Sequence, residues 1–295
     1  MATRNATTGE RSASSAGSAG ATAPPPSFLG SDFDFRRAGA VLRSQSLTPA
    51  LLRVSEVTIS YPTESGTFTA VEDVSFEVTK GEKFILLGPS GCGKSTLLKS
   101  VAGFIAPARG EVELDGRRVS RPGPDRVVVF QEFDQLLPWR TVMGNVTYPL
   151  RVARKMDDAA ARREASRFIT LVGLDRFADS YPHQLSGGMK QRVAIARSLA
   201  IDPAMLLMDE PFASLDALTR RKMQEELLTI WEATRKTILF VTHSIQEAVL
   251  LGDRILILST GPGRVRRLID NPAAGQRETV ASLAVQREIQ EILGE

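Results

Sequence analysis

Hydrophobic and polar residues alternate over the first well-patterned part of the chain. This alternation runs through Leu52–Tyr61 and recurs within Phe68–Val78, which predicts two half-buried β-strands separated by a turn near Glu64–Gly66. A third short strand is predicted at Glu111–Leu114, where Asp115-Gly116 follows as a tight turn. The early part of the patterned chain is therefore rich in strands.

A second kind of pattern, short and continuously apolar, predicts fully buried strands. Such runs, bounded by turn residues, are typical of the central sheet of an α/β protein. They are Lys83–Leu87, Val127–Phe130, Met205–Glu210, Thr237–His243 and Arg254–Ser259, and Arg264–Ile269 is a candidate for one more. Several of them end in polar residues, namely Gln131, Asp209, Glu210 and His243.

Helical spacing of apolar residues appears between these runs. It predicts helices over Thr96–Ala102, over Asp157–Val172 with Asp157 or Asp158 as N-cap, after Ser186, over Ala217–Thr234, and from about Glu278 onwards. The segment Phe133–Leu150 is apolar but fits neither a strand nor a helix. We interpret it either as core beneath a loop or as an interface for another protein.

Composition and charge narrow the class of protein. Residues 1 to about 47 consist mainly of Ala, Ser, Thr, Gly and Pro, so we expect a disordered tail. The net charge of +3 arises within the first 54 residues, and the balanced remainder gives no reason to expect nucleic-acid binding. One cysteine excludes an internal disulfide, and no run of about 18 apolar residues predicts a membrane span.

The strongest chemical signal is a glycine-rich loop between a predicted strand and a predicted helix. It fits the phosphate-binding pattern G-x-x-x-x-G-K-[ST]. Its glycines let backbone N–H groups turn towards anionic oxygens, Lys94 supplies a cation, and the Ser95 hydroxyl suits Mg²⁺. Cys92 is either a redox-sensitive thiol or a small residue that fits the loop. The predicted nucleotide-binding residues here are Gly88, Pro89, Ser90, Gly91, Cys92, Gly93, Lys94, Ser95 and Thr96.

Further candidate residues stand at strand ends and at a second helix start. Ser186, Gly187 and Gly188 open a helix in the manner of the first loop, although a plain Ser N-cap would give the same pattern. Asp209 could hold Mg²⁺ beside Ser95, and Glu210 could accept a proton from water. Other candidates also have structural explanations: Tyr61 could stack on a base or pack, Gln131 could reach the metal or solvent, and His243 could bind phosphate or be structural.

Taken together, these motifs resemble the ATP-binding cassette (ABC) ATPases in kind, order and spacing over roughly residues 51–268. The resemblance implies an α/β fold with a P-loop NTPase core, an antiparallel β subdomain and an inserted helical subdomain. The expected domains are a disordered tail (1–50), the first part of the ATP-binding core with the β subdomain (51–135), a helical signature subdomain (136–190), the second part of the core (191–268) and a C-terminal extension (269–295).

The resemblance also implies roles for individual residues. In this family two chains form a head-to-tail dimer, so that Ser186, Gly187 and Gly188 of one chain cap the ATP bound by the other. Tyr61 would stack on adenine. Ser95, Gln131 and Asp209 would be associated with Mg²⁺, and Glu210, His243 and Gln131 would be catalytic, with Glu210 as general base and His243 as the γ-phosphate switch. The cofactors expected are ATP and Mg²⁺.

A closer resemblance is to the ATPase subunits of bacterial importers for nitrate, sulfonates and taurine. It rests on Gln131–Val146, Asp209–Phe212 and Gly261–Val265. It implies a second copy of the chain, an integral membrane permease and a periplasmic or extracellular binding protein as partners, with the chain held at the cytoplasmic side of the membrane by the permease. The alternatives are a soluble non-transport ABC ATPase and an exporter ATPase subunit.

Overall fold

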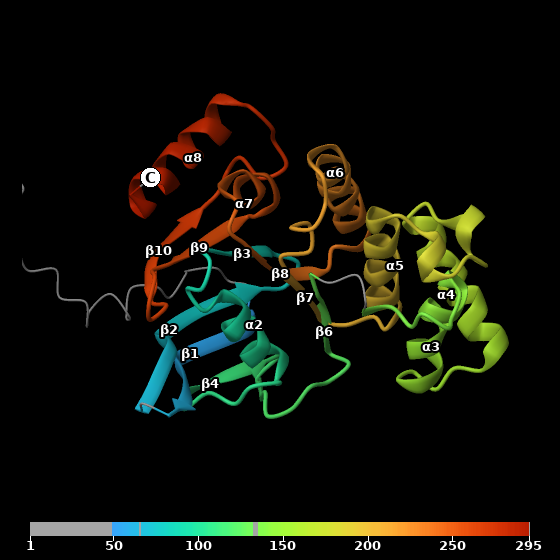
Figure 1. The fold of residues 1–295 in the computed structure, drawn as a ribbon, viewed down its shortest axis with the longest axis horizontal. Coiled ribbons are helices and arrows are strands. Elements are labelled where there is room, and N and C mark those ends of the chain that lie inside the picture. Colours follow the sequence, from blue (N-terminus) through green and yellow to red (C-terminus); the bar gives the residue numbers. More distant parts are fainter. Residues whose placement is uncertain (1–48, 65, 132–134, 295) are drawn as a thin grey trace, which may run out of the picture. The chain divides into compact units, whose positions relative to one another are not determined.

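Two β-sheets organise residues 49–64, 66–131 and 135–294, which the computed structural model describes (Figure 1). These residues fall within one compact unit. The predicted disordered tail lies outside the described residues, except for its last two positions. Among the described residues, none of the helices combines the length and the apolar composition that crossing a bilayer requires.

The smaller sheet is antiparallel and has the strand order β2-β1-β4-β5. Its strands are β1 (Ala50–Thr63), β2 (Gly66–Thr79), β4 (Arg109–Leu114) and the two-residue β5 (Arg117–Arg118). The predicted alternation of β1 is present, because Leu52, Val54, Val57 and Ile59 are buried. The register shifts between Val54 and Val57, so that these valines point inward although they are three residues apart.

The larger sheet contains the predicted buried strands in the order β10-β9-β3-β8-β7-β6. Its strands are β3 (Lys83–Leu87), β6 (Arg126–Val129), β7 (Met205–Asp209), β8 (Thr237–Thr242), β9 (Arg254–Leu258) and β10 (Val265–Asp270). All neighbours are parallel except β10, which runs antiparallel to β9. The carboxyl ends of β3, β8, β7 and β6 therefore meet at one edge.

Alternate residues of these strands enter two hydrophobic cores. Phe84, Leu86 and Leu239 belong to the core that includes α2 (Lys94–Ala102) and the antiparallel sheet. Ile85 and Phe240 belong to the other core, which includes α6 (Ala217–Thr234), α7 (Ile245–Leu251) and α8 (Val280–Leu293). Burial on both faces explains why the strands are continuously apolar.

Three helices, α3 (Val142–Val152), α4 (Asp158–Leu171) and α5 (Gly187–Ala200), pack together beside the larger sheet (Figure 1). As predicted, Asp157 is the N-cap of α4 and accepts from Ala160 N. Short 3₁₀ turns at Asp175–Phe177 and Pro182–Gln184 join α4 to α5. The predicted domain boundary at residue 190 falls inside α5, and the division into domains stays a prediction.

Helix α3 corrects, for residues 142–150, the interpretation of the segment 133–150 as neither strand nor helix, and residues 133 and 134 lie outside the described part. Val142, Val146 and Leu150 are buried at helical spacing. Gly144 and Pro149 are poor helix formers and obscure the pattern in the sequence. The helix still forms, with Pro149 in its last turn. The apolar face of α3 is core, whereas Trp139, before the helix, is 69% exposed, and the interface alternative for this segment stays a prediction.

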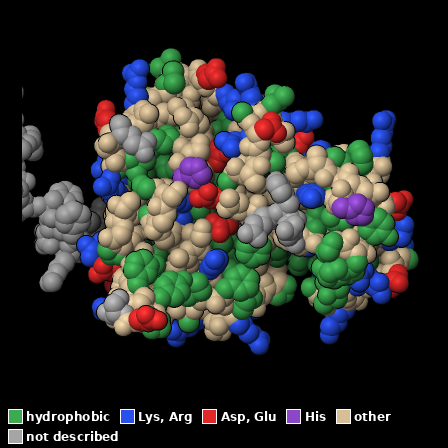
Figure 2. Space-filling model, in the orientation of Figure 1, with side chains coloured by type: hydrophobic (Ala, Val, Ile, Leu, Met, Phe, Trp, Pro, Cys, Tyr) green, Lys and Arg blue, Asp and Glu red, His purple; other side chains and the backbone are tan. Residues whose placement is uncertain are grey.

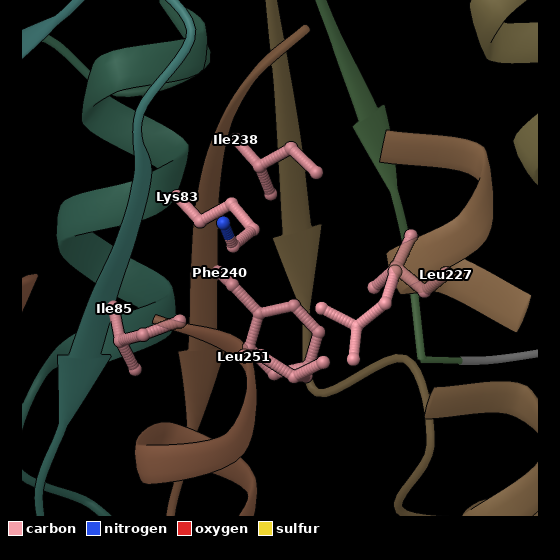
Figure 3. A pocket seen from close by; sticks show the side chains of 7 residues that line it. Lys83, Ile85, Leu227, Ile238, Phe240 and Leu251 are labelled. Atoms are coloured by element: carbon pink, nitrogen blue, oxygen red, sulfur yellow. The ribbon is translucent and has the colours of Figure 1, made fainter. Parts of the chain in front are cut away.

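A small cavity of about 10 Å³ marks the place where β3 and β8 meet α6 and α7. Ile85, Ile238, Phe240, Leu227 and Leu251 surround it together with the Lys83 side chain (Figure 3). The Lys83 ammonium forms an ion pair with Asp253 at 2.7 Å and lies 3.3 Å from the ring centroid of Trp231. This part of the core is therefore close-packed, and it is sensitive to loss of volume.

Truncation of Phe240, which is fully buried and lies 5.7 Å from Phe212 between ring centroids, tests this packing. We expect Phe240→Ala to lower the free energy of unfolding by about 3–5 kcal/mol, because it enlarges a cavity that the sheet cannot close. Urea denaturation measures the change. The control is Leu283→Ala on the exposed side of α8, for which we expect less than about 0.5 kcal/mol. A loss below about 1 kcal/mol for Phe240→Ala would contradict this description of the core.

Candidate active site

The phosphate-binding loop connects β3 to α2 at the carboxyl edge of the larger sheet. Gly91 and Gly93 have φ angles of 79° and 94°, in the left-handed region that disfavours residues with a Cβ. A Cβ on Gly93 would lie 2.6 Å from Val71 Cγ2 and 2.7 Å from Ala70 O. The helix begins at Lys94, two residues earlier than predicted, so its free N–H groups face the loop.

Lys94 lies almost entirely inside this loop. Its side chain is 4% exposed, and its Nζ donates to Gly88 O at 2.7 Å and to Pro89 O at 2.9 Å. The same ammonium lies 3.8 Å from Glu210 Oε1. Loop and lysine therefore place one positive charge and several N–H donors around the same small volume, which suits bound phosphate groups.

The next residue, Ser95, contacts the end of β7. Ser95 Oγ donates to Asp209 Oδ1 at 2.7 Å. Burial raises the pKa of Asp209, and the nearby Glu210 charge raises it further, although the Ser95 hydrogen bond and Lys99 oppose the shift. A cation at this carboxylate would offset the cost of burying its charge.

A hydroxyl and one carboxylate fit Mg²⁺, which takes hard oxygen ligands, commonly one or two carboxylates together with waters and substrate phosphates. Among the described residues there is no group of three or more His, Cys, Asp or Glu side chains that could hold a metal by themselves. Ser95 and Asp209 therefore suit a metal ion shared with a phosphate ligand better than an ion held by protein ligands alone.

Glu210 follows Asp209 in a constrained backbone conformation. Its φ of 44° is unusual for a residue with a side chain, and its N–H donates to Val241 O of the neighbouring strand at 3.1 Å. Glu210 Oε2 lies 2.9 Å from His243 Nδ1, and the His243 side chain is 52% exposed. Such strain is often retained where a side chain must be aimed for function. Figure 2 shows both histidines of the chain at the surface, one of them beside acidic side chains.

The structure thus brings Lys94, Ser95, Asp209, Glu210 and His243 into one connected cluster. Gln131 follows β6 at the same edge and is exposed, but among the described residues no hydrogen bond joins it to Ser95 or Asp209. The three residues after Gln131 lie outside the described part.

Three other predicted site residues belong to other elements, β1 and the start of α5. Tyr61 lies on β1 opposite Phe68 and is half-buried against the antiparallel-sheet core. Ser186 is the N-cap of α5, and its Oγ accepts from Met189 N at 3.3 Å. Gly188 is buried, and a Cβ there would lie 3.0 Å from Thr219 Cγ2 of α6. The turn at Ser186–Gly188 therefore packs on α6, whereas the phosphate-binding loop leads into α2.

Cys92 is 1% exposed, and burial raises the pKa of its thiol. A buried thiol with a raised pKa is a poor redox sensor, which favours the interpretation of Cys92 as a small residue that fits the loop.

The sequence pattern does not reveal the buried polar side chains next to His243, namely Thr242, Gln224 and Glu247. They come from three separate segments, and no local signal connects them.

Comparison with known proteins gives a consistent result. A family model described as "ABC transporter" matches residues 71–213. A taurine import ATP-binding protein of Rhizobium johnstonii is 49% identical over 217 residues, covering 73% of this chain and 82% of the relative. A nitrate import ATP-binding protein of Synechococcus elongatus is 46% identical over 224 residues, covering 75% and 81%.

Among solved structures, a dimeric ATP-binding cassette in a post-hydrolysis state with ADP and Pi is 34% identical, with a TM-score of 0.66. It is matched over 74% of this chain and 98% of the cassette. The fold is thus an ABC ATPase fold, with a P-loop core, an antiparallel sheet and a group of helices. The chain belongs to the family of ABC transporter ATP-binding proteins, and it is an ATPase.

Proposed function

We propose that the chain is the ATP-hydrolysing subunit of an importer for a small anion such as nitrate, an alkanesulfonate or taurine. The observation that carries this proposal is the single cluster of Lys94, Ser95, Asp209, Glu210 and His243 at the carboxyl edge of the sheet. The names of the two relatives above support import over export or a soluble role.

In this proposal the first loop and Lys94 hold the β- and γ-phosphates of ATP. Ser95 and Asp209, with Gln131, hold Mg²⁺, which when bound neutralises phosphate charge. Tyr61 stacks on adenine. Glu210 Oε accepts a proton from the attacking water, and the hydrogen bond with His243 holds the Glu210 carboxylate in place. His243 remains half-exposed, so its other ring nitrogen is available to the γ-phosphate.

Ser186, Gly187 and Gly188 act on a different nucleotide. They form the start of α5, where Gly188 lies against α6, whereas Lys94 begins a different helix, α2. In a head-to-tail dimer of two copies, this helix start would face the γ-phosphate held by the partner. The solved cassette described above is dimeric, which supports a dimer of this chain.

The permease partner binds, in this proposal, at the surface formed by Trp139 and the exposed side of α3. Figure 2 shows hydrophobic side chains gathered over α3, where Tyr148 and Val152 are exposed. A hollow of about 480 Å³ lies between the end of α3 and the start of α4. It is lined by Arg140, Tyr148, Arg151, Val152, Lys155, Met156 and Asp158. This excess of cations suits a permease segment that carries both apolar and acidic side chains. The permease would hold the chain at the cytoplasmic side of the membrane, and a binding protein outside would deliver the anion.

Co-purification from native membranes tests the proposal. We expect a multi-span permease and a binding protein to accompany the chain, and the binding protein to bind nitrate, taurine or an alkanesulfonate in a ligand screen. Recovery only from the soluble fraction, together with nucleic acid or ribosomes, would leave the ATPase but overturn its role in import.

The same preparation tests the permease surface. Trp139→Ala removes an aromatic side chain that is 69% exposed and therefore adds little to the core. We expect the amount of permease recovered per folded chain to fall at least about tenfold, since exposed aromatic anchors dominate many interfaces. Leu283→Ala, at an exposed position of α8, is the matched control and should recover normal amounts. Normal recovery with Trp139→Ala would place the permease elsewhere.

A further inference from the structure

The segment that follows β10 makes hydrogen bonds to the C-terminal end of α7, the helix that begins two residues after His243. Asn271 is buried, and its Nδ2 donates to Val249 O at 2.8 Å and to Gly252 O at 2.6 Å. Gly275 N donates to Leu250 O at 2.7 Å. The last carbonyls of a helix lack partners within the helix, so these bonds tie the C-terminal end of α7 to the C-terminal segment.

A chain of hydrogen bonds connects the same segment to the beginning of α7. Arg277 Nη2 donates to Gln224 Oε1 at 2.9 Å, and Gln224 Nε2 donates to Glu247 Oε1 at 3.0 Å. The other oxygen of that carboxylate, Glu247 Oε2, accepts from Thr242 Oγ1 at 2.7 Å. Three of these four side chains are buried, with exposed fractions of 6% for Gln224, 7% for Glu247 and 2% for Thr242.

The backbone on both sides of His243 is attached to this chain of bonds. Ser244 N donates to Thr242 Oγ1 at 3.0 Å, and Ser244 Oγ accepts from Glu247 N at 3.3 Å. His243 itself points outward to Glu210. Its position therefore depends on Thr242 and Ser244, which are held in turn by Glu247.

Arg277 determines the direction of the hydrogen bonds in this chain. A buried carboxylate needs donors, and Gln224 can supply one only if its Nε2 faces Glu247. With Oε1 turned towards Glu247 the amide would repel it. Arg277 has donors only, so it fixes Oε1 on its own side. Arg277 is itself held by Arg221 O at 3.3 Å and by Glu225 at 3.6 Å, both on α6.

We propose that Arg277 is a positioning residue for His243, and that the C-terminal segment 271–277 thereby sets the rate of ATP hydrolysis. The contacts run from Arg277 through Gln224 and Glu247 to Thr242, the residue before the switch histidine. This inference rests on the role given to His243 under the proposed function. It adds a part of the chain outside the residues that touch nucleotide.

The test compares the steady-state ATPase kinetics of full-length variants. Arg277→Met keeps the length and apolar stem of the side chain but removes its donors. We expect kcat to fall about tenfold while KM for ATP changes less than about twofold, because misplacing a reacting group affects the transition state more than nucleotide binding. The matched control is Arg287→Met at an exposed position of α8, which should leave both constants unchanged.

Gln224→Met interrupts the same series of hydrogen bonds at its middle. It should likewise lower kcat about tenfold with little change in KM. If Arg277→Met does not fold, Gln224→Met still tests the proposal. A normal kcat in either folded variant would overturn the inference. A rise in KM as large as the fall in kcat would also overturn it, because it would indicate a general loss of order in the nucleotide site.

His243→Gln, measured alongside, separates the inference from the proposed function. Near-complete loss of turnover with His243→Gln but normal kcat with Arg277→Met would overturn only the positioning role. Wild-type turnover with His243→Gln would overturn the role of His243 and the inference with it.

Discussion

Replacing Glu210 by Gln should lower the kcat for ATP by about two to four orders of magnitude while ATP still binds, because a general base contributes rate enhancement of about this size. Gln has the shape of Glu and can still bond His243 Nδ1, which lies 2.9 Å from Glu210 Oε2. It also removes the negative charge 3.8 Å from Lys94 Nζ, so nucleotide affinity should not decrease. What it lacks is the basicity needed to take a proton from water.

The measurement is single-turnover hydrolysis together with equilibrium binding of ATP. Glu232→Gln, at an exposed position of α6, is the matched control and should retain wild-type kcat. If Glu210→Gln kept more than about a tenth of the wild-type rate, Glu210 would not be the base. Loss of ATP binding would instead indicate damage to the loop, since Glu210 sits at φ 44° in a conformation that depends on its surroundings.

The sequence predicted well the parts of this fold that are encoded locally. Buried strands such as Lys83–Leu87 and Met205–Asp209 appear as short apolar runs because both faces of the larger sheet are covered. The polar residues that end these runs meet at one edge because the strands are parallel. The strand-end position of Asp209 and Glu210 therefore predicts both as site residues, and the structure places Asp209 in contact with Ser95.

Features that depend on distant segments were not predicted. Helix α7 has seven residues, too few to display a period of 3.6. Helix α3 was hidden by Gly144 and Pro149. The bonds from Arg277 to Gln224 and from Gln224 to Glu247 join residues 53 and 23 positions apart, and no local pattern marks such pairs. Nor does the pattern reveal that Glu210 has a positive φ.

Two inactive variants of this chain should restore activity to each other when mixed. Lys94→Met removes the phosphate cation but fills the buried space of the lysine stem, which is 4% exposed. Ser186→Asp keeps a good N-cap for α5 but places a negative charge where the proposed dimer places the partner's γ-phosphate. Each variant alone should lose nearly all ATP turnover.

In a head-to-tail dimer each site combines the loop of one chain with the Ser186 turn of the other. A mixed dimer then has both defects in one site and none in the other. With equal mixing, half of the dimers are mixed and each has one of its two sites intact, so we expect about a quarter of wild-type turnover.

The sharpest control is a second mixture, of Lys94→Met with Glu210→Gln. Lys94 Nζ and Glu210 Oε1 lie 3.8 Å apart in the same chain, so both residues serve the same nucleotide. Every dimer in that mixture therefore has two defective sites. It should show no recovery. Recovery in the first mixture alone requires that Ser186 acts on the nucleotide of the other chain. Equal failure of both mixtures would mean that Ser186 and Lys94 serve one nucleotide within one chain, although in this structure they begin different helices on different parts of the fold.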